Sequence, residues 1–171
     1  MDSDGRISLT LLILLYSTYP KSNGCTGGFI MDAYEWVRRQ GGISTATPPG
    51  VLRLRLCTPK LPSLKAVKVT RSYYVFGGEG EMTSYLSAGH TLSVQVDARN
   101  WSSYKSGIFK GCGNTALWAL NHAVQIVGFN KVEGYWIVRN SWGTGWGEDG
   151  YMKLAMVSKK GTCCGRCVSF F

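Results

Sequence analysis

The chain has 171 residues, of which 44% are hydrophobic and 17% charged, and its formal net charge is +9 at pH 7. This composition excludes a disordered or fibrous protein, and the length suits one ordinary domain or two small ones. Because the basic residues are dispersed, without a run of five or a zinc-finger signature, a solvated basic face is favoured over a nucleic-acid site.

Residues 9–16 form a largely apolar segment near the start of the chain. The segment is much too short for a membrane-spanning helix, which needs about 20 apolar residues. As a secretory signal it has a weak N-terminal region, with Asp2 and Asp4 against Arg6, and it lacks a small-residue cleavage pattern. We therefore expect no membrane span and favour a core-facing or aberrant segment over a signal peptide.

Further along the chain the hydrophobic spacing indicates helices first and strands later. Apolar side chains at helical spacing from Ile30 to Val37 predict an amphipathic helix over residues 31–40, ended by Gly41. The stretch 47–62 follows neither period and predicts a loop. A second, short helix is expected over residues 81–88. The remaining runs predict strands at residues 66–72, 92–96, 124–129, 135–139 and 150–154.

The most informative segment is Asn-Ser-Trp-Gly-Thr-Gly-Trp-Gly at residues 140–147, preceded by Asn-His-Ala-Val at residues 121–124. His122 is one of two histidines and is the candidate for proton transfer near neutral pH. The side-chain oxygen of Asn140 is able to accept an imidazole N–H, which fixes the tautomer and leaves the other ring nitrogen as a base.

These motifs, together with residues 7–10, 24–28 and 104–109, resemble the papain family of cysteine peptidases. The resemblance implies an α+β, papain-like fold of two lobes. It places a partial helical lobe at residues 1–65 and an antiparallel β-barrel-like lobe, which carries the catalytic His and Asn, at residues 66–171.

The resemblance also assigns roles: His122 is the catalytic base, Asn140 orients it, and Trp142 shields their hydrogen bond from water. In this family the nucleophilic Cys lies in a Cys-Gly-Ser-Cys-Trp type segment, and none of the six cysteines here has that context. The chain is expected to start downstream of that segment and of the family's oxyanion Gln. We therefore expect a cysteine-type endopeptidase family member that is inactive by itself.

A substrate cleft follows from the same resemblance, with polypeptides as substrates and a hydrophobic side chain preferred two residues before the scissile bond. Gln95 departs from the family's usual pocket residue, and the extra residues 117–119 are able to displace His122. The substrate-binding residues implied are Gly27, Gly28, Phe29, Ile30, Asn121 and Ala155, with Ala155 at the base of the pocket.

Six cysteines in a chain of this size favour an oxidising compartment. The resemblance points to a lysosomal or extracellular protein and to a disulfide between Cys112 and Cys164. It leaves the pairing of Cys25, Cys57 and the other cysteines open, and at least one free or labile thiol is expected.

Two other classes of function compete with this hypothesis. One is a non-catalytic pseudo-peptidase that binds peptides or cystatin-like inhibitors. The other rests on the Cys-x-x-Cys at residues 164–167, which elsewhere indicates redox or zinc chemistry, although no redox-fold context surrounds it. We expect no cofactor and no bound metal. The adjacent Glu148 and Asp149 are expected to be solvated loop residues.

Overall fold

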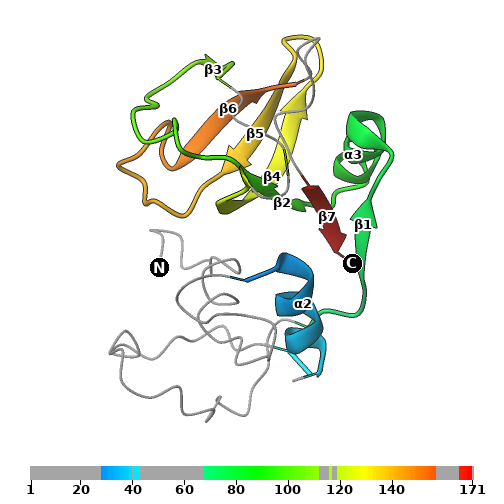
Figure 1. Ribbon diagram of the computed structural model, residues 1–171. Helices are drawn as coiled ribbons and strands as arrows, with labels where there is room; N and C mark the ends of the chain where they lie inside the picture. The colour runs from blue at the N-terminus through cyan, green and yellow to red at the C-terminus, as the bar shows by residue number, and fades with distance from the viewer. Residues whose placement is uncertain are drawn as a thin grey trace, which may run out of the picture. The chain divides into compact units, whose positions relative to one another are not determined.

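The computed structural model describes residues 28–39, 41–42, 68–111, 116, 119–156 and, in their backbone only, 166–170. The chain divides into two compact units, Met1–Ser72 and Tyr73–Phe171 (Figure 1). The predicted loop 47–62 lies outside the described residues, and the expected lobe boundary at residue 65 stays a prediction.

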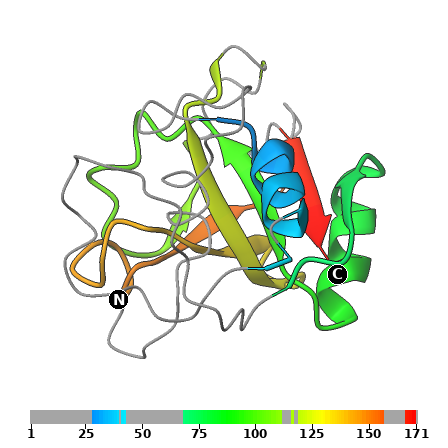
Figure 2. The same ribbon diagram turned by 90° about the horizontal axis from the view of Figure 1, so that it is seen from below.

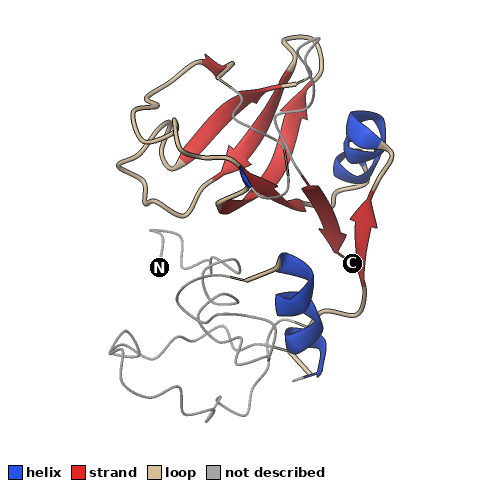
Figure 3. Ribbon diagram, in the orientation of Figure 1, coloured by secondary structure: helices blue, strands red, loops and turns tan. Residues whose placement is uncertain are grey.

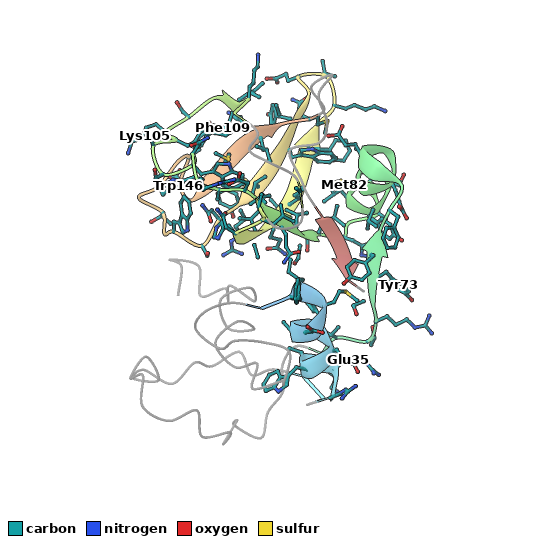
Figure 4. The ribbon with its side chains drawn as sticks, in the orientation of Figure 1. Glu35, Tyr73, Met82, Lys105, Phe109 and Trp146 are labelled. Atoms are coloured by element: carbon teal, nitrogen blue, oxygen red, sulfur yellow. The ribbon has the colours of Figure 1, made fainter. Side chains whose placement is uncertain are left out.

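In the first unit, helix α2 spans Ile30–Arg39, one residue earlier at each end than predicted. It buries Ile30 and Val37 on its apolar face. Glu35 forms ion pairs with Arg38 and Arg39 at 2.8 and 2.7 Å, and these hydrogen bonds lower the pKa of its carboxyl to about 2 (Figure 4 shows Glu35). The three ionic side chains lie one turn apart, as helical geometry requires.

The end of α2 is closed by the predicted glycines. The backbone N–H of Gly42 donates to the carbonyl of Val37 at 3.0 Å, and that of Gly41 donates to Arg38 at 3.1 Å. This pair of bonds is the Schellman motif, which needs a left-handed residue, and Gly41 has φ +71°.

The second unit is built on one seven-stranded sheet with the strand order β1-β7-β2-β4-β5-β6-β3. The pairs β2–β7, β2–β4, β4–β5 and β5–β6 are antiparallel, and β3–β6 is parallel. The α+β class predicted from the sequence is confirmed. Figures 1 and 3 show the strands, which are β1 Ser72–Val75, β2 Leu92–Val96, β3 Ile108–Phe109, β4 His122–Asn130, β5 Tyr135–Arg139, β6 Tyr151–Ala155 and β7 Arg166–Phe170.

The predicted bounds of β2 and β5 agree with the structure, and β6 begins and ends one residue later than predicted. The strand expected over residues 66–72 was wrong, because residues 68–71 are not in a strand and β1 begins only at Ser72. Residues 66–72 have the alternation of apolar and polar side chains that is typical of a strand. A strand also needs a hydrogen-bonding neighbour, and β1 lies at the edge of the sheet, where it has a neighbour on one side only.

Helix α3, Gly78–Ser87, packs against β2 and β4 of the same sheet (Figure 2). It begins three residues before the predicted start because Glu81 accepts the backbone N–H of Gly77 at 2.6 Å, which satisfies a donor at the helix start. Met82 of α3 is buried in the core (Figure 4). Among the residues that the structure describes, the largest fully buried side chains are Trp101, Trp136, Met82, Leu92, Ile126, Met152 and Leu154.

Candidate active site

The ends of two neighbouring strands bring His122 and Asn140 together. His122 is the first residue of β4 and is paired with Val96 of β2, while Asn140 directly follows the last residue of β5. The register between β4 and β5 pairs Gln125 with Arg139, so both residues lie at the same end of the sheet. His122 and Asn140 therefore meet because β4 pairs with β5, the next strand along the chain.

A hydrogen bond of 2.8 Å joins His122 Nε2 to Asn140 Oδ1. The same Oδ1 accepts the backbone N–H of Ser141 at 2.8 Å. Because a backbone N–H can only donate, the amide of Asn140 is fixed with its oxygen toward both partners. Nε2 must therefore carry the hydrogen of the neutral imidazole, and Nδ1 keeps its lone pair.

Two aromatic rings contact the imidazole of His122. The indole of Trp142 stacks on the imidazole with centroids 5.0 Å apart and an interplanar angle of 28°. The buried Trp101 meets the imidazole edge-on, at 6.4 Å and 88°. Trp142 keeps 41% of its surface exposed, so the imidazole lies under one exposed indole and beside one buried indole.

Burial lowers the pKa of His122 below its ordinary value, and the hydrogen bond to Asn140 opposes this shift. The imidazole is therefore neutral at pH 7, since its unperturbed pKa is about 6.5. A neutral ring with one nitrogen bound and one lone pair available has the properties of a general base.

The side-chain nitrogen of Asn140 is the one buried side-chain polar atom without a hydrogen-bond partner in the part of the chain that the structure describes. A buried unsatisfied donor costs about 1–3 kcal/mol of stability. Asn140 is thus retained at the sheet end at the expense of stability.

Residues 140–150 form the glycine-rich turn that the sequence predicted. The backbone N–H of Asn140 donates to the carbonyl of Gly150 at 3.0 Å, which closes the turn at its base. Gly147 has φ +61°, and a Cβ there would lie 2.5 Å from the carbonyl oxygen of Tyr151. Only glycine fits at this position.

The second indole of the motif, Trp146, is buried and supports the first. Its ring lies 5.1 Å from that of Trp142, edge to face, and its Nε1–H donates to the carbonyl of Trp101 at 3.1 Å. The ring of Tyr104 contacts the rings of both Trp146 and Phe109. Figure 4 labels Trp146 and Phe109. Trp146 can be buried because the carbonyl of Trp101 accepts its N–H, and its ring then packs against Trp142 and Tyr104.

Glu148 was expected to be a solvated loop residue, and its side chain is partly exposed but also binds groups within the protein. Its carboxylate accepts the backbone N–H of Gly107 at 2.8 Å and pairs with Lys153 at 3.0 Å. It also lies 3.0 Å from the hydroxyl of Tyr104, whose proton is shared between this carboxylate and the carbonyl of Gly107. The bond from Lys153 is the main reason that the pKa of Glu148 is lowered. Glu148 therefore accepts a backbone N–H from one loop and pairs with a lysine of β6.

Asn121 was expected to bind substrate, but its side chain is engaged within the protein. Its oxygen accepts the backbone N–H of Ala98 at 2.9 Å, and its nitrogen lies 3.4 Å from a carboxylate oxygen of Asp97. Asp97 is itself buried and binds both the backbone N–H and the guanidinium of Arg99. These bonds fix the turn that leads to Trp101.

Sequence reasoning missed Trp101 and Asp97. Both follow β2, in a segment that carries an acidic residue and a tryptophan directly after a buried strand. A tryptophan in a turn is an unusual use of a large apolar residue, and this signal was available in the sequence.

Ala155 does not lie near His122. It is the last residue of β6 and pairs with Tyr135, whereas Tyr151, the first residue of β6, pairs with Arg139 beside Asn140. With a rise of about 3.3 Å per residue, the length of β6 separates Ala155 from the site by roughly 13 Å along the strand. The expected place of Ala155 at the base of the specificity pocket stays a prediction, because the other expected pocket residues, Phe29 and Ile30, lie in the first unit.

Three of the other expected substrate residues lie in the first unit. Ile30 is buried at the start of α2, and Phe29 is 58% exposed just before it. Gly28 is partly buried. The expected residue Gly27 and the expected disulfide partners Cys112 and Cys164 lie outside the described residues.

The extra residues 117–119 do not separate His122 from Asn140, because the hydrogen bond between them is formed. In the described ranges no three His, Cys, Asp or Glu side chains gather in a way that could hold a metal ion. Nor does any helix in those ranges have the length and apolar character needed to cross a membrane.

Comparisons with known proteins agree on one family. The family described as papain family cysteine protease matches residues 11–169. A cysteine proteinase of Theileria parva is 42% identical over 149 residues, which cover 84% of this chain and 32% of that protein. Vignain of Vigna mungo is 34% identical over 166 residues, 93% of this chain and 45% of the relative. The chain thus spans less than half the length of these two curated relatives.

Solved structures of the same kind share the fold. The bromelain protease from Ananas comosus, in complex with the E64 inhibitor, matches with a TM-score of 0.75 and 31% sequence identity. This match covers 96% of the present chain and 77% of that protease. The papain-like fold expected from the sequence is confirmed.

Proposed function

The chain belongs to the papain family of cysteine proteases, and on that premise we propose that it supplies the base and the orienting amide of a cysteine-peptidase site. His122 is the base, Asn140 orients it, and Trp142 shields their hydrogen bond. The observation that supports this most is the 2.8 Å contact of Nε2 with Oδ1 beneath a stacked indole. It leaves Nδ1 as the nitrogen that meets a thiol.

The proton moves through Nδ1 in this proposal. A thiol placed there gives its proton to Nδ1, and the thiolate attacks the carbonyl carbon of a peptide bond. The imidazolium then returns the proton to the departing amine, and water later hydrolyses the thioester. Asn140 holds the ring in position throughout and stabilises its charged form through Nε2–H.

The nucleophile is the missing part. None of the six cysteines in the sequence lies in a Cys-Gly-Ser-Cys-Trp type segment. We therefore propose that these 171 residues do not hydrolyse peptides by themselves. Polypeptides with a hydrophobic side chain near the scissile bond are the proposed substrates of the completed site, and cystatin-like inhibitors are proposed ligands.

Two measurements test this function. The purified chain is incubated with a fluorogenic dipeptide, and no cleavage sensitive to a thiol-directed epoxide is expected. A polypeptide that carries a Cys-Gly-Ser-Cys-Trp segment and its upstream Gln is then fused to the N-terminus. Cleavage is expected to appear in the fusion and to be lost in its His122→Gln variant. Cleavage by the unfused chain, or an active fusion that tolerates His122→Gln, contradicts the proposal.

The compartment and the cysteine pairing follow as secondary proposals. A lysosomal or extracellular location suits the six cysteines, and a Cys112–Cys164 disulfide is the proposed bridge. Counting free thiols in the denatured, unreduced protein tests the pairing. Four free thiols agree with Cys112–Cys164 as the single bridge, and two free thiols indicate one further bridge, whereas six or none contradicts the proposal.

A further inference from the structure

The two nitrogens of His122 have different surroundings. Nε2 is bound to Asn140, whereas Nδ1 makes no hydrogen bond with any residue of the described ranges. The ring is only half-buried. A neutral imidazole whose lone pair is unused is a nucleophile as well as a base, and it needs no cysteine to attack a sufficiently activated carbonyl.

The stacked indole leaves that lone pair clear. Trp142 covers a face of the imidazole at an interplanar angle of 28°, whereas the lone pair of Nδ1 lies in the plane of the ring. The indole keeps 41% of its surface exposed, which provides an apolar surface beside the attacking nitrogen. An aryl group is the chemical class that binds to such a surface.

We propose that His122 hydrolyses activated aryl esters by nucleophilic catalysis through Nδ1. Nδ1 forms a bond to the acyl carbon, the bond from that carbon to the aryl oxygen breaks, and the aryloxide leaves with its electron pair. Water then attacks the acyl carbon of the N-acylimidazolium. The carbon–Nδ1 bond then breaks and returns its electron pair to the neutral imidazole, the carboxylic acid is released, and the second proton of the attacking water goes to solvent.

Asn140 takes part through the other nitrogen. Acylation of Nδ1 places a positive charge on the ring, and the Nε2–H bond to the amide oxygen strengthens as that charge develops. The same amide orientation that suits proton transfer therefore also suits acyl transfer. The inference rests on the proposed function only in using the same pair of residues.

The test is the hydrolysis of p-nitrophenyl acetate by the full chain after every thiol has been alkylated. His90, the other of the two histidines, provides the matched control. We expect His122→Gln to lower the second-order rate constant roughly tenfold or more, and His90→Gln to leave it unchanged. Asn140→Ala is expected to lower the rate as well, and circular dichroism verifies the fold of each variant.

A second measurement needs no variant. The rate for the unmutated chain is expected to rise with pH as the imidazole loses its proton, with an apparent pKa equal to that of His122 measured by NMR. A rate that survives His122→Gln, or a pH profile that follows another group, overturns the proposal. Alkylation blocks the six thiols of the chain but spares the imidazole, so ester hydrolysis that remains is not thiol chemistry. The proposed function is tested separately by peptide cleavage in the fusion, so either hypothesis can fail without the other.

Discussion

The imidazole of His122 and the indole of Trp142 lie nearly parallel, with centroids 5.0 Å apart. The same imidazole is hydrogen-bonded to Asn140, and Trp142 keeps 41% of its surface exposed. Since burial is the main cause of the lowered pKa of His122, this indole should control the protonation of the imidazole.

Replacing Trp142 by Ala is therefore expected to raise the pKa of His122 toward about 6.5, because water reaches the ring. An NMR titration of the His122 ring measures this change. Phe76→Ala is the control, because Phe76 is 80% exposed and this substitution removes an aromatic ring elsewhere on the surface. An unchanged pKa in Trp142→Ala contradicts the shielding role.

The pH dependence of stability follows from the same shift. The folded-state pKa of His122 lies below the unfolded value, so the unfolded chain binds the proton more strongly. The stabilisation is fully present above about pH 6.5 and is lost as the pH falls from there through the lower folded pKa. Urea unfolding across this range should show that loss in the unmutated chain and a weaker loss in His122→Gln. Equal pH dependence of the two proteins is the contrary outcome.

Two glycines of the motif at residues 140–147 provide a matched pair. Gly147→Ala should destabilise the fold by more than about 1–2 kcal/mol, because a left-handed residue with a Cβ is unfavourable and the Cβ also meets the carbonyl of Tyr151. Gly145→Ala should be nearly neutral, since a Cβ there has nothing within 4 Å. Thermal unfolding compares the stabilities of the two variants. A similar loss of stability in both would contradict the backbone conformation described for this turn.

The hydroxyl of Tyr104 is expected to stabilise the second unit. It binds Gly107 and accepts the backbone N–H of Lys153 at 3.2 Å. Tyr104→Phe keeps the ring but leaves these groups unpaired, at a cost of about 1–3 kcal/mol. Tyr73→Phe, which removes a hydroxyl from a more exposed ring, is the comparison. If denaturant unfolding shows Tyr104→Phe to be no less stable than Tyr73→Phe, the bonds contribute nothing.

The position of Asn121 separates a positioning role from substrate binding. Asn121→Asp keeps an acceptor for the N–H of Ala98 but places a second carboxylate beside that of Asp97. The like charges raise the folded pKa of one carboxyl, so the variant should be less stable than the unmutated chain at pH 7. The difference should shrink as the pH falls through that raised pKa. A stability difference that does not depend on pH argues against the contact with Asp97.

Sequence motifs were sufficient to predict two parts of the candidate site, the glycine-rich turn and the pair of His122 and Asn140. The spacing of glycines and indoles predicted the turn, and the pairing of His122 with Asn140 was predicted from the resemblance to the papain family. Register was not predictable in the same way. The error over residues 66–72 arose because the extent of a strand depends on its hydrogen-bonding partners, and those belong to distant segments.

The hydrogen-bond partners of loop side chains could not be predicted either. Glu148 is bound by Gly107 and Lys153, and Asn121 by Ala98, and none of these contacts follows from the periodicity of the sequence. Buried polar groups find partners wherever the fold brings donors together, so a loop carboxylate cannot be assumed to face water.

The tautomer of His122 is the most direct test of the account. Correlation of ring protons with ring nitrogens in an NMR spectrum at pH 7 distinguishes a protonated from an unprotonated nitrogen, and His90 serves as the internal reference. We predict a single tautomer with hydrogen on Nε2, a bare Nδ1, and a slowly exchanging Nε2 proton that is lost in Asn140→Ala. A hydrogen on Nδ1, or an Nε2 proton that exchanges as fast with Asn140 present as without it, would contradict the account.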